Sequence, residues 1–180
     1  VRPSNEIDDL IPGVTLNLHR PSDGPVSLEV SPDRESVKES IINFVGLYNQ
    51  VIRDINIYTR TNEEIINEIE YFNDEERQEA LNNLGLLQGD SLLSQMQSRL
   101  QNIMMNPHPT QADEQTRLLA QIGISTNAGS PGSRGVNPSR LRGYLEINEE
   151  TLDSSLESNY QAVRQLFGFD SNGDLVADSG

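Results

Sequence analysis

A long helical seam between residues 31 and 59 constrains the fold of this chain more than any other feature. The stretch opens with Ser31-Pro32, a capping hydroxyl followed by the one helical position that suits proline. Apolar residues then recur at alternating spacings of four and three, which places them on one stripe of a helix. A stripe this broad has to be buried against partner helices, so we predict a helical bundle built on this helix. The stripe consists of Val37, Ile41, Phe44, Tyr48, Val51, Ile55 and Tyr58, widened by Ile42, Val45 and Ile52.

The composition excludes several classes of protein. Of the 180 residues, 34% are hydrophobic and 5% aromatic, which predicts a thin core in an elongated body. The formal net charge of -15 argues against binding to nucleic acid or to an anionic membrane surface. The chain has no cysteine, so disulfides, zinc thiolates and cysteine nucleophiles are excluded. No apolar run reaches membrane-spanning length, and we predict no membrane insertion. The start lacks methionine and a signal-peptide core, as expected of a fragment of a longer protein.

Further helices are predicted after the long one. Residues 61–64 have the spacing of a capping box and start a second helix, which continues or restarts over residues 74–84. Asp90 caps another helix, and the NPHP sequence at 106–109 ends it because proline disfavours helix on both sides. Asn148 caps a last helix. Seam residues of the final two helices are Leu93, Met96, Leu100 and Ile103, then Leu152, Leu156, Tyr160, Val163 and Phe167.

Short strands are predicted around this helical body. Residues 14–18 and 26–30 alternate apolar and polar side chains, with a turn at 21–24 between them. Residues 118–125 fit a strand, or a short helix followed by a strand. Residues 143–147 read as a strand, and the Gly-, Ser- and Arg-rich segment before them as a surface loop. Together these patterns predict an α+β fold, mainly a helical bundle with peripheral strands or hairpins.

Several local patterns occur together in one known family. SNEIDDLIPGVTLNL at 4–18 resembles a segment of the flagellar filament-capping proteins, the hook-associated protein 2 family, and IINFVGLYNQVI at 41–52 resembles a helix of that family. LLQGDSLLSQMQSRL at 86–100, IGIST at 122–126 and GYLEINEETLDSSL at 143–156 follow in the same order. Residues carrying the first two resemblances are Ser4, Asn5, Ile7, Asp9, Ile11, Gly13, Val14, Thr15, Leu16 and Leu18, then Phe44, Val45, Tyr48 and Asn49.

The sequence also departs from the family pattern. The region between IGIST and GYLEI, usually a tight turn, is extended here, and the stretch at 110–115 looks like an addition. The terminal heptad-bearing segments of the family are absent from this sequence. We interpret the extra residues as surface insertions on the same fold.

The resemblance implies a specific role. Residues 1–30 would be the closing strands of a β-rich head domain, and residues 31–180 a helical leg domain with a surface loop at 127–142. Family members form a homo-oligomeric ring at the distal tip of the bacterial flagellum, are secreted through the flagellar export channel, and promote flagellin assembly. Expected partners are further copies of the chain, flagellin, hook–filament junction proteins and an export chaperone. The alternative is a secreted adhesin or a calcium-stabilised surface binding module.

The sequence offers weak candidates for chemistry. Residues 170–174, DSNGD, resemble the opening of a calcium loop, but Leu175 replaces the required glycine, and a turn explains them better. His19 and His108 have no third ligand at metal spacing nearby. The acidic pairs at 8–9, 63–64 and 149–150 lie at element starts, where carboxylates favour the helix dipole or remain solvated. We therefore predict no enzyme activity, no cofactor and no metal site.

Two sets of residues are candidates for assembly. The seam residues Val37, Ile41, Phe44, Tyr48, Val51 and Ile55 are predicted to form the core, or in part to meet another subunit or the terminal helices of the family. Arg134, Arg140 and Arg142 make the loop locally basic in an acidic chain. Such a loop is either solvated or pairs with an acidic neighbour in a ring.

Overall fold

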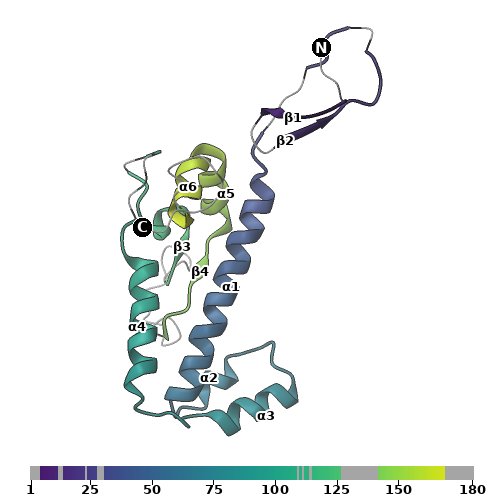
Figure 1. Cartoon of the computed structure of the whole chain (residues 1–180). Helices are drawn as coiled ribbons and strands as arrows, with labels where there is room; N and C mark the ends of the chain where they lie inside the picture. Colours follow the sequence, from purple (N-terminus) through teal and green to yellow (C-terminus); the bar gives the residue numbers. More distant parts are fainter. Residues whose placement is uncertain are drawn as a thin grey trace. The chain divides into compact units, whose positions relative to one another are not determined.

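The computed structural model describes residues 5–11, 14–22, 24–27, 31–108, 110, 112–113, 115–126 and 142–168. The chain divides into two compact units, Val1–Pro32 and Asp33–Gly180. Helices dominate the described part, and its strands form two short antiparallel pairs (Figure 1). The predicted α+β class with a mainly helical body is therefore confirmed.

The first unit is a hairpin of β1 (Glu6–Ile11) and β2 (Val14–Asn17). Ile7 pairs with Leu16, and Glu6 with Asn17. The strand predicted at 14–18 is present as β2, and its partner is β1. Pro-Gly at 12–13 is a turn signal in the sequence between these two runs. Residues 24–27 form no strand, and 28–30 lie outside the described residues.

The long helix α1 (Arg34–Thr59) opens the second unit and has 26 residues. Its cap is Asp33, not the predicted Ser31-Pro32. The Asp33 carboxylate accepts hydrogen bonds from the Ser36 backbone N–H at 3.0 Å and from the Ser36 hydroxyl at 2.8 Å. These bonds favour the ionised form and lower the pKa of Asp33. A carboxylate at this position also suits the positive end of the helix dipole.

A small lobe, residues 61–84, follows α1. The predicted second helix is reduced to the single turn α2 (Glu64–Asn67), because Asn62 accepts from the Glu64 N–H two residues on and forms a local turn instead of a capping box. Helix α3 (Asp74–Asn83) starts with a true capping box between Asn73 and Glu76. The lobe shares a second hydrophobic cluster with the end of α1, which consists of Ile57 from α1 and of Ile65, Ile66, Ile69 and Ala80.

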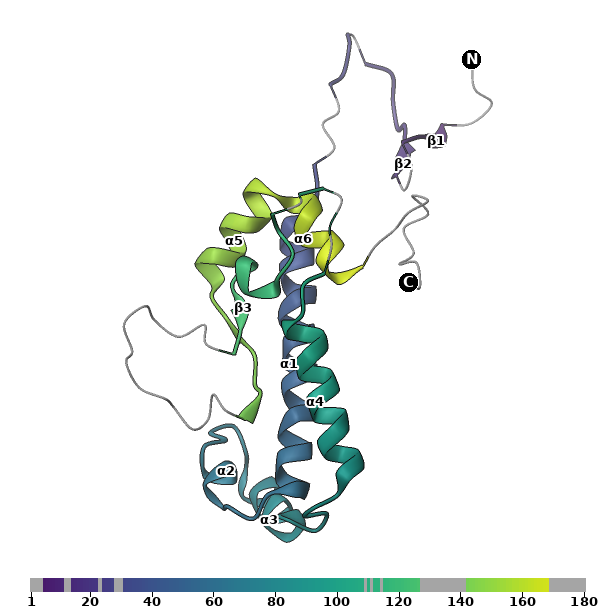
Figure 2. The ribbon, with the colours of Figure 1, turned by 90° about the vertical axis from the view of Figure 1, so that its left-hand side faces the viewer.

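Helix α4 (Ser91–Met105) returns beside α1, and the two views agree on this (Figures 1 and 2). Its predicted cap, Asp90, accepts from the Leu93 N–H at 2.9 Å. The short 3-10 helix η1 (Leu119–Ile122) then leads into β3 (Ile124–Ser125), which pairs with β4 (Glu146–Ile147).

The last predicted helix is two helices, α5 (Glu149–Ser158) and α6 (Tyr160–Phe167). The break falls at Asn159, whose side-chain amide donates to Asp113 at 2.8 Å and to Thr116 at 3.3 Å. This tertiary contact competes with helix continuation, because asparagine forms hydrogen bonds readily in non-helical conformations. Asn148 caps α5 as predicted.

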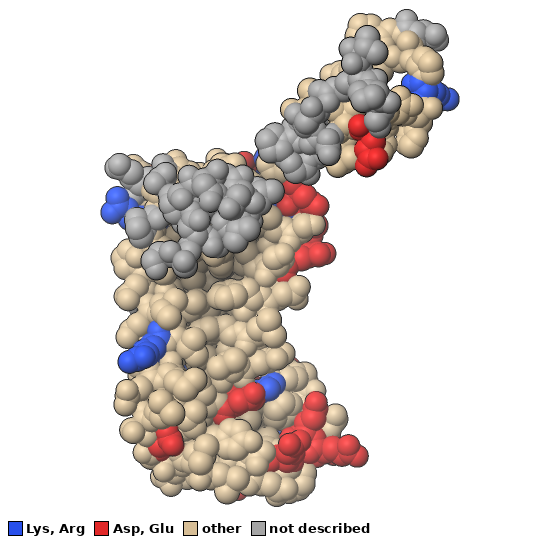
Figure 3. Space-filling model, viewed as in Figure 1, with Lys and Arg blue, Asp and Glu red and all other residues tan. Residues whose placement is uncertain are grey.

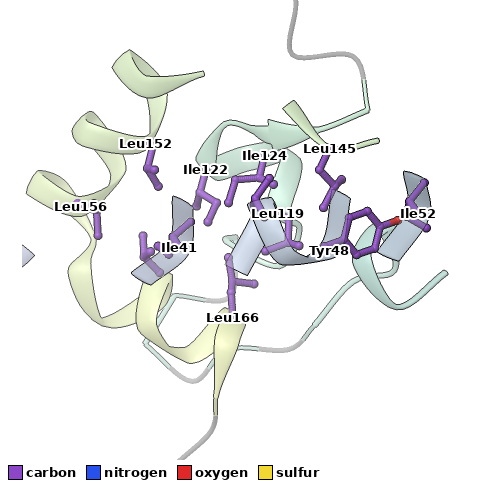
Figure 4. Packing of buried hydrophobic residues seen from close by; sticks show 12 residues of the cluster. Ile41, Tyr48, Ile52, Leu119, Ile122, Ile124, Leu145, Leu152, Leu156 and Leu166 are labelled. Carbon is purple, nitrogen blue, oxygen red and sulfur yellow. The ribbon is translucent and has the colours of Figure 1, made fainter. Parts of the chain in front are cut away.

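The main core lies where α1 meets α5, α6, η1 and the strands β3 and β4. Figure 4 shows side chains from these elements converging on the long helix. The buried residues of this cluster are Ile41, Val45, Tyr48, Ile52, Leu119, Ile122, Ile124, Leu145, Leu152, Leu156, Val163 and Leu166.

Candidate assembly surface

The stripe of α1 that enters the core differs from the predicted seam at two positions. Val45 and Ile52 are buried, whereas Phe44 and Val51 are 39% and 46% exposed. Val37 is half-buried and packs against the core cluster. The buried stripe keeps the predicted alternation of four and three and consists of Ile41, Val45, Tyr48, Ile52 and Ile55.

One side of this stripe binds residues 142–145, a segment with a turn at Gly143 that leads into β4 and that we call the strap. Asn49 exchanges two hydrogen bonds with Leu145, its amide donating to the carbonyl at 2.9 Å and its oxygen accepting from the N–H at 2.8 Å. Asn56 donates to the Arg142 carbonyl at 3.2 Å, and the Tyr48 hydroxyl donates to the Gly143 carbonyl at 3.1 Å. Side chains of α1 thus replace the neighbouring strand that would otherwise satisfy these groups.

Helix α4 holds the strap from its other flank. The Gln97 amide donates at 3.2 Å both to the Arg142 carbonyl and to the Asn56 side-chain oxygen. Gly143 has a φ of 89°, and a Cβ there would lie 1.9 Å from Gln101 Nε2. Only glycine satisfies both the left-handed backbone and the close approach of α4.

The opposite side of α1 and α4 presents exposed apolar side chains. On α1, Phe44 and Val51 lie about 140–160° around the helix axis from Asn49. On α4, Met96 and Ile103 lie about 100–160° around the axis from the glutamines beside the strap. Because the strap occupies one side of both helices, these residues share the other side. We call this set the apolar face; it comprises Phe44, Leu47, Val51, Leu92, Met96 and Ile103, all exposed.

The apolar face carries no charged residue among its members. Figure 3 shows the surface over α1 and α4 largely free of charged side chains, in a chain of net charge -15. Phe44 also makes an edge-to-face contact with Phe167 of α6, with ring centroids 5.7 Å apart. A group of exposed apolar side chains without charged neighbours in the set is typical of an interaction surface.

Arg142 does not belong to an exposed basic loop. Its residue exposure is 5%, and its guanidinium makes a two-pronged ion pair with Glu68 in the lobe, with one N–O distance of 3.1 Å. The basic-loop prediction therefore rests on Arg134 and Arg140, which lie outside the described residues. Sequence reasoning missed the pair because 74 residues separate its partners. It also missed the strap, although two asparagines seven apart beside an apolar stripe were a usable signal.

Three titratable side chains in or near the core have raised pKa values. Burial raises the pKa of Tyr48 to about 12, and burial is also the main cause that raises the pKa of Tyr144. At the other end of α1, a hydrogen bond to Asp153 is the main cause that raises the pKa of Lys38. All three shifts stabilise the protonated forms.

The other residues considered for catalysis or metal binding are mostly exposed. His19 is exposed, and His108 Nε2 lies 2.7 Å from the Ile103 carbonyl at the end of α4. The acidic pairs at 63–64 and 149–150 are exposed at helix starts. Within the described ranges, no group of three His, Cys, Asp or Glu side chains is placed to hold a metal, and no helix is long and apolar enough to cross a membrane. The calcium-like sequence at 170–174 falls outside those ranges.

Comparison with known proteins decides the family. The sequence model described as the flagellar hook-associated protein 2 C-terminus matches residues 1–180. The chain belongs to this family. Flagellar hook-associated protein 2 of Treponema maltophilum and that of Treponema pallidum are each 46% identical over 99% of the chain. The protein of that name from Borreliella burgdorferi is 37% identical, also over 99% of the chain.

These hook-associated relatives are much longer than the chain, which spans 27%, 24% and 27% of their lengths. A solved structure of the Escherichia coli flagellar cap protein, covering its domains D1 to D3, has a similar fold, with a TM-score of 0.57 and 24% identity. The similarity covers 97% of this chain and 38% of that one.

The hook-associated family motifs meet in the structure. IGIST and GYLEI, distant in sequence, supply the two strands of the β3–β4 pair. Gly123, with a φ of 88°, ends η1, and a Cβ there would lie 2.7 Å from the Asn148 carbonyl oxygen. The motif glycines Gly123 and Gly143 therefore allow close approach to the start of α5 and to α4, respectively.

Proposed function

We propose that this chain is the carboxyl-terminal part of a structural subunit of the flagellar filament cap, acting at the distal filament tip by assembly. The observation that carries the proposal is the family match over residues 1–180, together with relatives named flagellar hook-associated protein 2. The similar Escherichia coli structure is that of a flagellar cap protein, which agrees with this role.

The mechanism is mechanical. Helix α1, at 26 residues, is about 39 Å long at 1.5 Å per residue. Packing against α4 and α5, with α6 in the same core, makes it a stiff support. In the proposal, residues 31–180 are the leg and residues 1–30 belong to the head domain. A ring of such subunits covers the filament end and leaves space in which each arriving flagellin folds.

The partners follow from this role. They are further copies in the homo-oligomeric ring, flagellin, the hook–filament junction proteins, and an export chaperone before secretion through the flagellar channel. No catalytic step is included. The loop arginines Arg134 and Arg140 are assigned to contacts between subunits.

The apolar face is assigned one occupant, an apolar helix from the part of the same polypeptide outside these residues. About three quarters of each hook-associated relative lies outside the matched region, since the chain covers 27% of the first. Apolar side chains on two neighbouring helices offer the ridges and grooves against which a third helix packs. Phe44 and Val51, which the predicted seam included, are assigned to this contact.

A substitution on this face tests the cap function. Leu47→Asp alters a side chain that is 63% exposed in this structure. We expect the purified 180-residue chain to keep its circular dichroism spectrum and its melting temperature within about 2 °C, as expected for an exposed site. In cells, the same change in the full-length protein should reduce filament number and raise unassembled flagellin outside the cytoplasm. Gln78→Asp, at an exposed position on α3, is the matched control.

Two results would contradict the proposal. Normal filaments with no released flagellin in a strain lacking the whole gene would reject the cap role. Normal filaments in Leu47→Asp alone would reject only the functional importance of the face.

The occupant is identified by cross-linking. Because the chain has no cysteine, a single Leu47→Cys residue can carry a photo-crosslinker in the full-length protein if the rest of that protein also lacks cysteine or is made cysteine-free. A cross-linked peptide from the same polypeptide, at monomer mass, is the expected result. A product at dimer mass would assign the face to a second copy instead.

The secreted adhesin or calcium-stabilised module, the second hypothesis from sequence, gains no support from the comparisons. Its strongest motif, DSNGD, lies outside the described residues.

A further inference from the structure

The strap contacts α1 at two separate sites. Asn49 binds Leu145 and Asn56 binds Arg142, so seven helix residues correspond to three strap residues. The turn at Gly143, with its φ of 89°, lies between the two strap sites and sets their separation. Both hydrogen-bonding sites are therefore engaged at the same time, and a one-residue slip of the strap would break both.

Arg142 lies at the end of the strap where three helices meet. Its carbonyl accepts from Asn56 of α1 and from Gln97 of α4. Its guanidinium pairs with Glu68, the residue that ends α2. The side chain of Arg142 is 7% exposed, whereas that of Glu68 is 41% exposed. The arginine charge is thus withdrawn from water and depends on the half-exposed glutamate for compensation.

The lobe, residues 61–84, is attached to the end of α1 by Ile57 of its cluster and by Arg53, which donates to the Tyr71 hydroxyl at 3.1 Å, but the Arg142–Glu68 pair joins it to the strap. Its hydrophobic cluster shares no member with the main core cluster in the described part of the chain. Helix α2 is a single turn, too short to be stable without tertiary contacts. The Arg77 guanidinium donates to the Ile66 and Ile69 carbonyls, which fixes α2 to α3 but not to the strap.

We propose that Arg142 is a latch that couples docking of the strap to ordering of the lobe. If the lobe moves away, a buried guanidinium is left unpaired, and the strap has to leave the groove between α1 and α4 to hydrate it. If the strap leaves, Arg142 withdraws from Glu68 and the lobe loses its link to the strap. Because this coupling is an equilibrium property, it acts equally in both directions.

The coupling is tested by substituting a residue on one side and measuring hydrogen exchange on the other. In the full-length protein, Glu68→Gln should speed amide hydrogen exchange of the Leu145 N–H by at least about tenfold, or about 1.4 kcal/mol of local opening. Asn49→Ala, which alters the strap site, should speed exchange in α2 by a similar factor, although Asn49 binds the opposite end of the strap from Arg142. The matched controls are Glu70→Gln in the lobe and Gln50→Ala on α1, both at exposed positions.

A variant that carries both substitutions distinguishes the latch from two independent effects. If the latch exists, Glu68→Gln and Asn49→Ala together raise exchange in α2 by less than the product of their separate effects, since both open the same unit. Effects confined to the substituted element, or fully multiplicative effects, would overturn the proposal. Faster exchange of the buried amides of α5 would also overturn it, because that result would show general destabilisation.

Discussion

Adjacent substitutions on α1 provide the sharpest test of the packing described above. Ile52 is 0% exposed in the main core, whereas its neighbour Val51 is 46% exposed on the apolar face. Both residues are β-branched and occupy the middle of the same helix. We therefore expect Ile52→Ala to destabilise the chain strongly and Val51→Ala to have little effect.

The magnitudes follow from burial. Ile52→Ala removes three buried carbons, about 2.4 kcal/mol of transfer free energy at 0.8 kcal/mol each, and leaves a cavity that raises the loss to about 3–5 kcal/mol. Val51→Ala removes two half-exposed carbons, about 0.8 kcal/mol, and alanine recovers about half of that through helix propensity. A difference of about 3 kcal/mol between the two variants corresponds to about 6–12 °C in melting temperature.

The assay is chemical and thermal unfolding of the 180-residue chain, followed by circular dichroism, with Ile52→Val as an intermediate variant expected to lose about 0.5–1.5 kcal/mol. A larger loss for Val51→Ala than for Ile52→Ala would show that the buried stripe runs through positions 44 and 51, as the sequence suggested. Equal losses would also refute the packing. In the full-length protein, the loss for Val51→Ala should increase, because the proposed helix covers that side chain.

Two further predictions concern the strap. Gly143→Ala should destabilise the chain by about 1–2 kcal/mol because of the left-handed backbone, and by a further amount because the new Cβ clashes with Gln101. Adding Gln101→Ala should remove only the part of the loss that the clash causes. If the double variant is as stable to unfolding as the unsubstituted chain, the backbone cost is refuted. Tyr48 has a pKa of about 12 when folded and an ordinary value of 10.0, so its contribution is complete below pH 10 and is lost as the pH rises from 10 to 12. The free energy of unfolding should fall by about 1–3 kcal/mol over that window. Tyr48→Phe should flatten this slope while lowering stability at pH 7, and an unchanged slope would contradict the assignment.

The sequence predicted the existence of α1 but not which of its sides is buried. Phe44 and Val51 fit the same alternation as Val45 and Ile52, one position away. An apolar set this wide contains two overlapping stripes, and a straight helix drifts by about 20° per heptad relative to either. The choice depends on where α4, α5 and the strap lie, and the local pattern carries no information on that.

Long-range polar contacts account for most of the remaining differences. Asn159 breaks the last helix through Asp113, 46 residues away in the chain, and Arg142 is buried through Glu68, 74 residues away. Local sequence propensity predicts helices and turns, but it cannot predict a contact between residues that are far apart in the chain. By contrast, the caps at Asp90 and Asn148 were predictable, because the capping side chain and the backbone N–H that it binds are three residues apart.

The hydrogen bonds that α1 and α4 make to the strap all reach its main chain. Asn49, Asn56, Tyr48 and Gln97 all bind carbonyl or N–H groups, which every residue type presents in the same way. A substitution in these helix residues therefore removes a hydrogen bond whatever the sequence of the strap. The strap side chains meet a separate requirement, because Leu145 is buried in the main core and Tyr144 packs against it. The helices thus specify the path of the chain and the core specifies its apolar residues, so loops of different length that precede the strap can be delivered to the same groove.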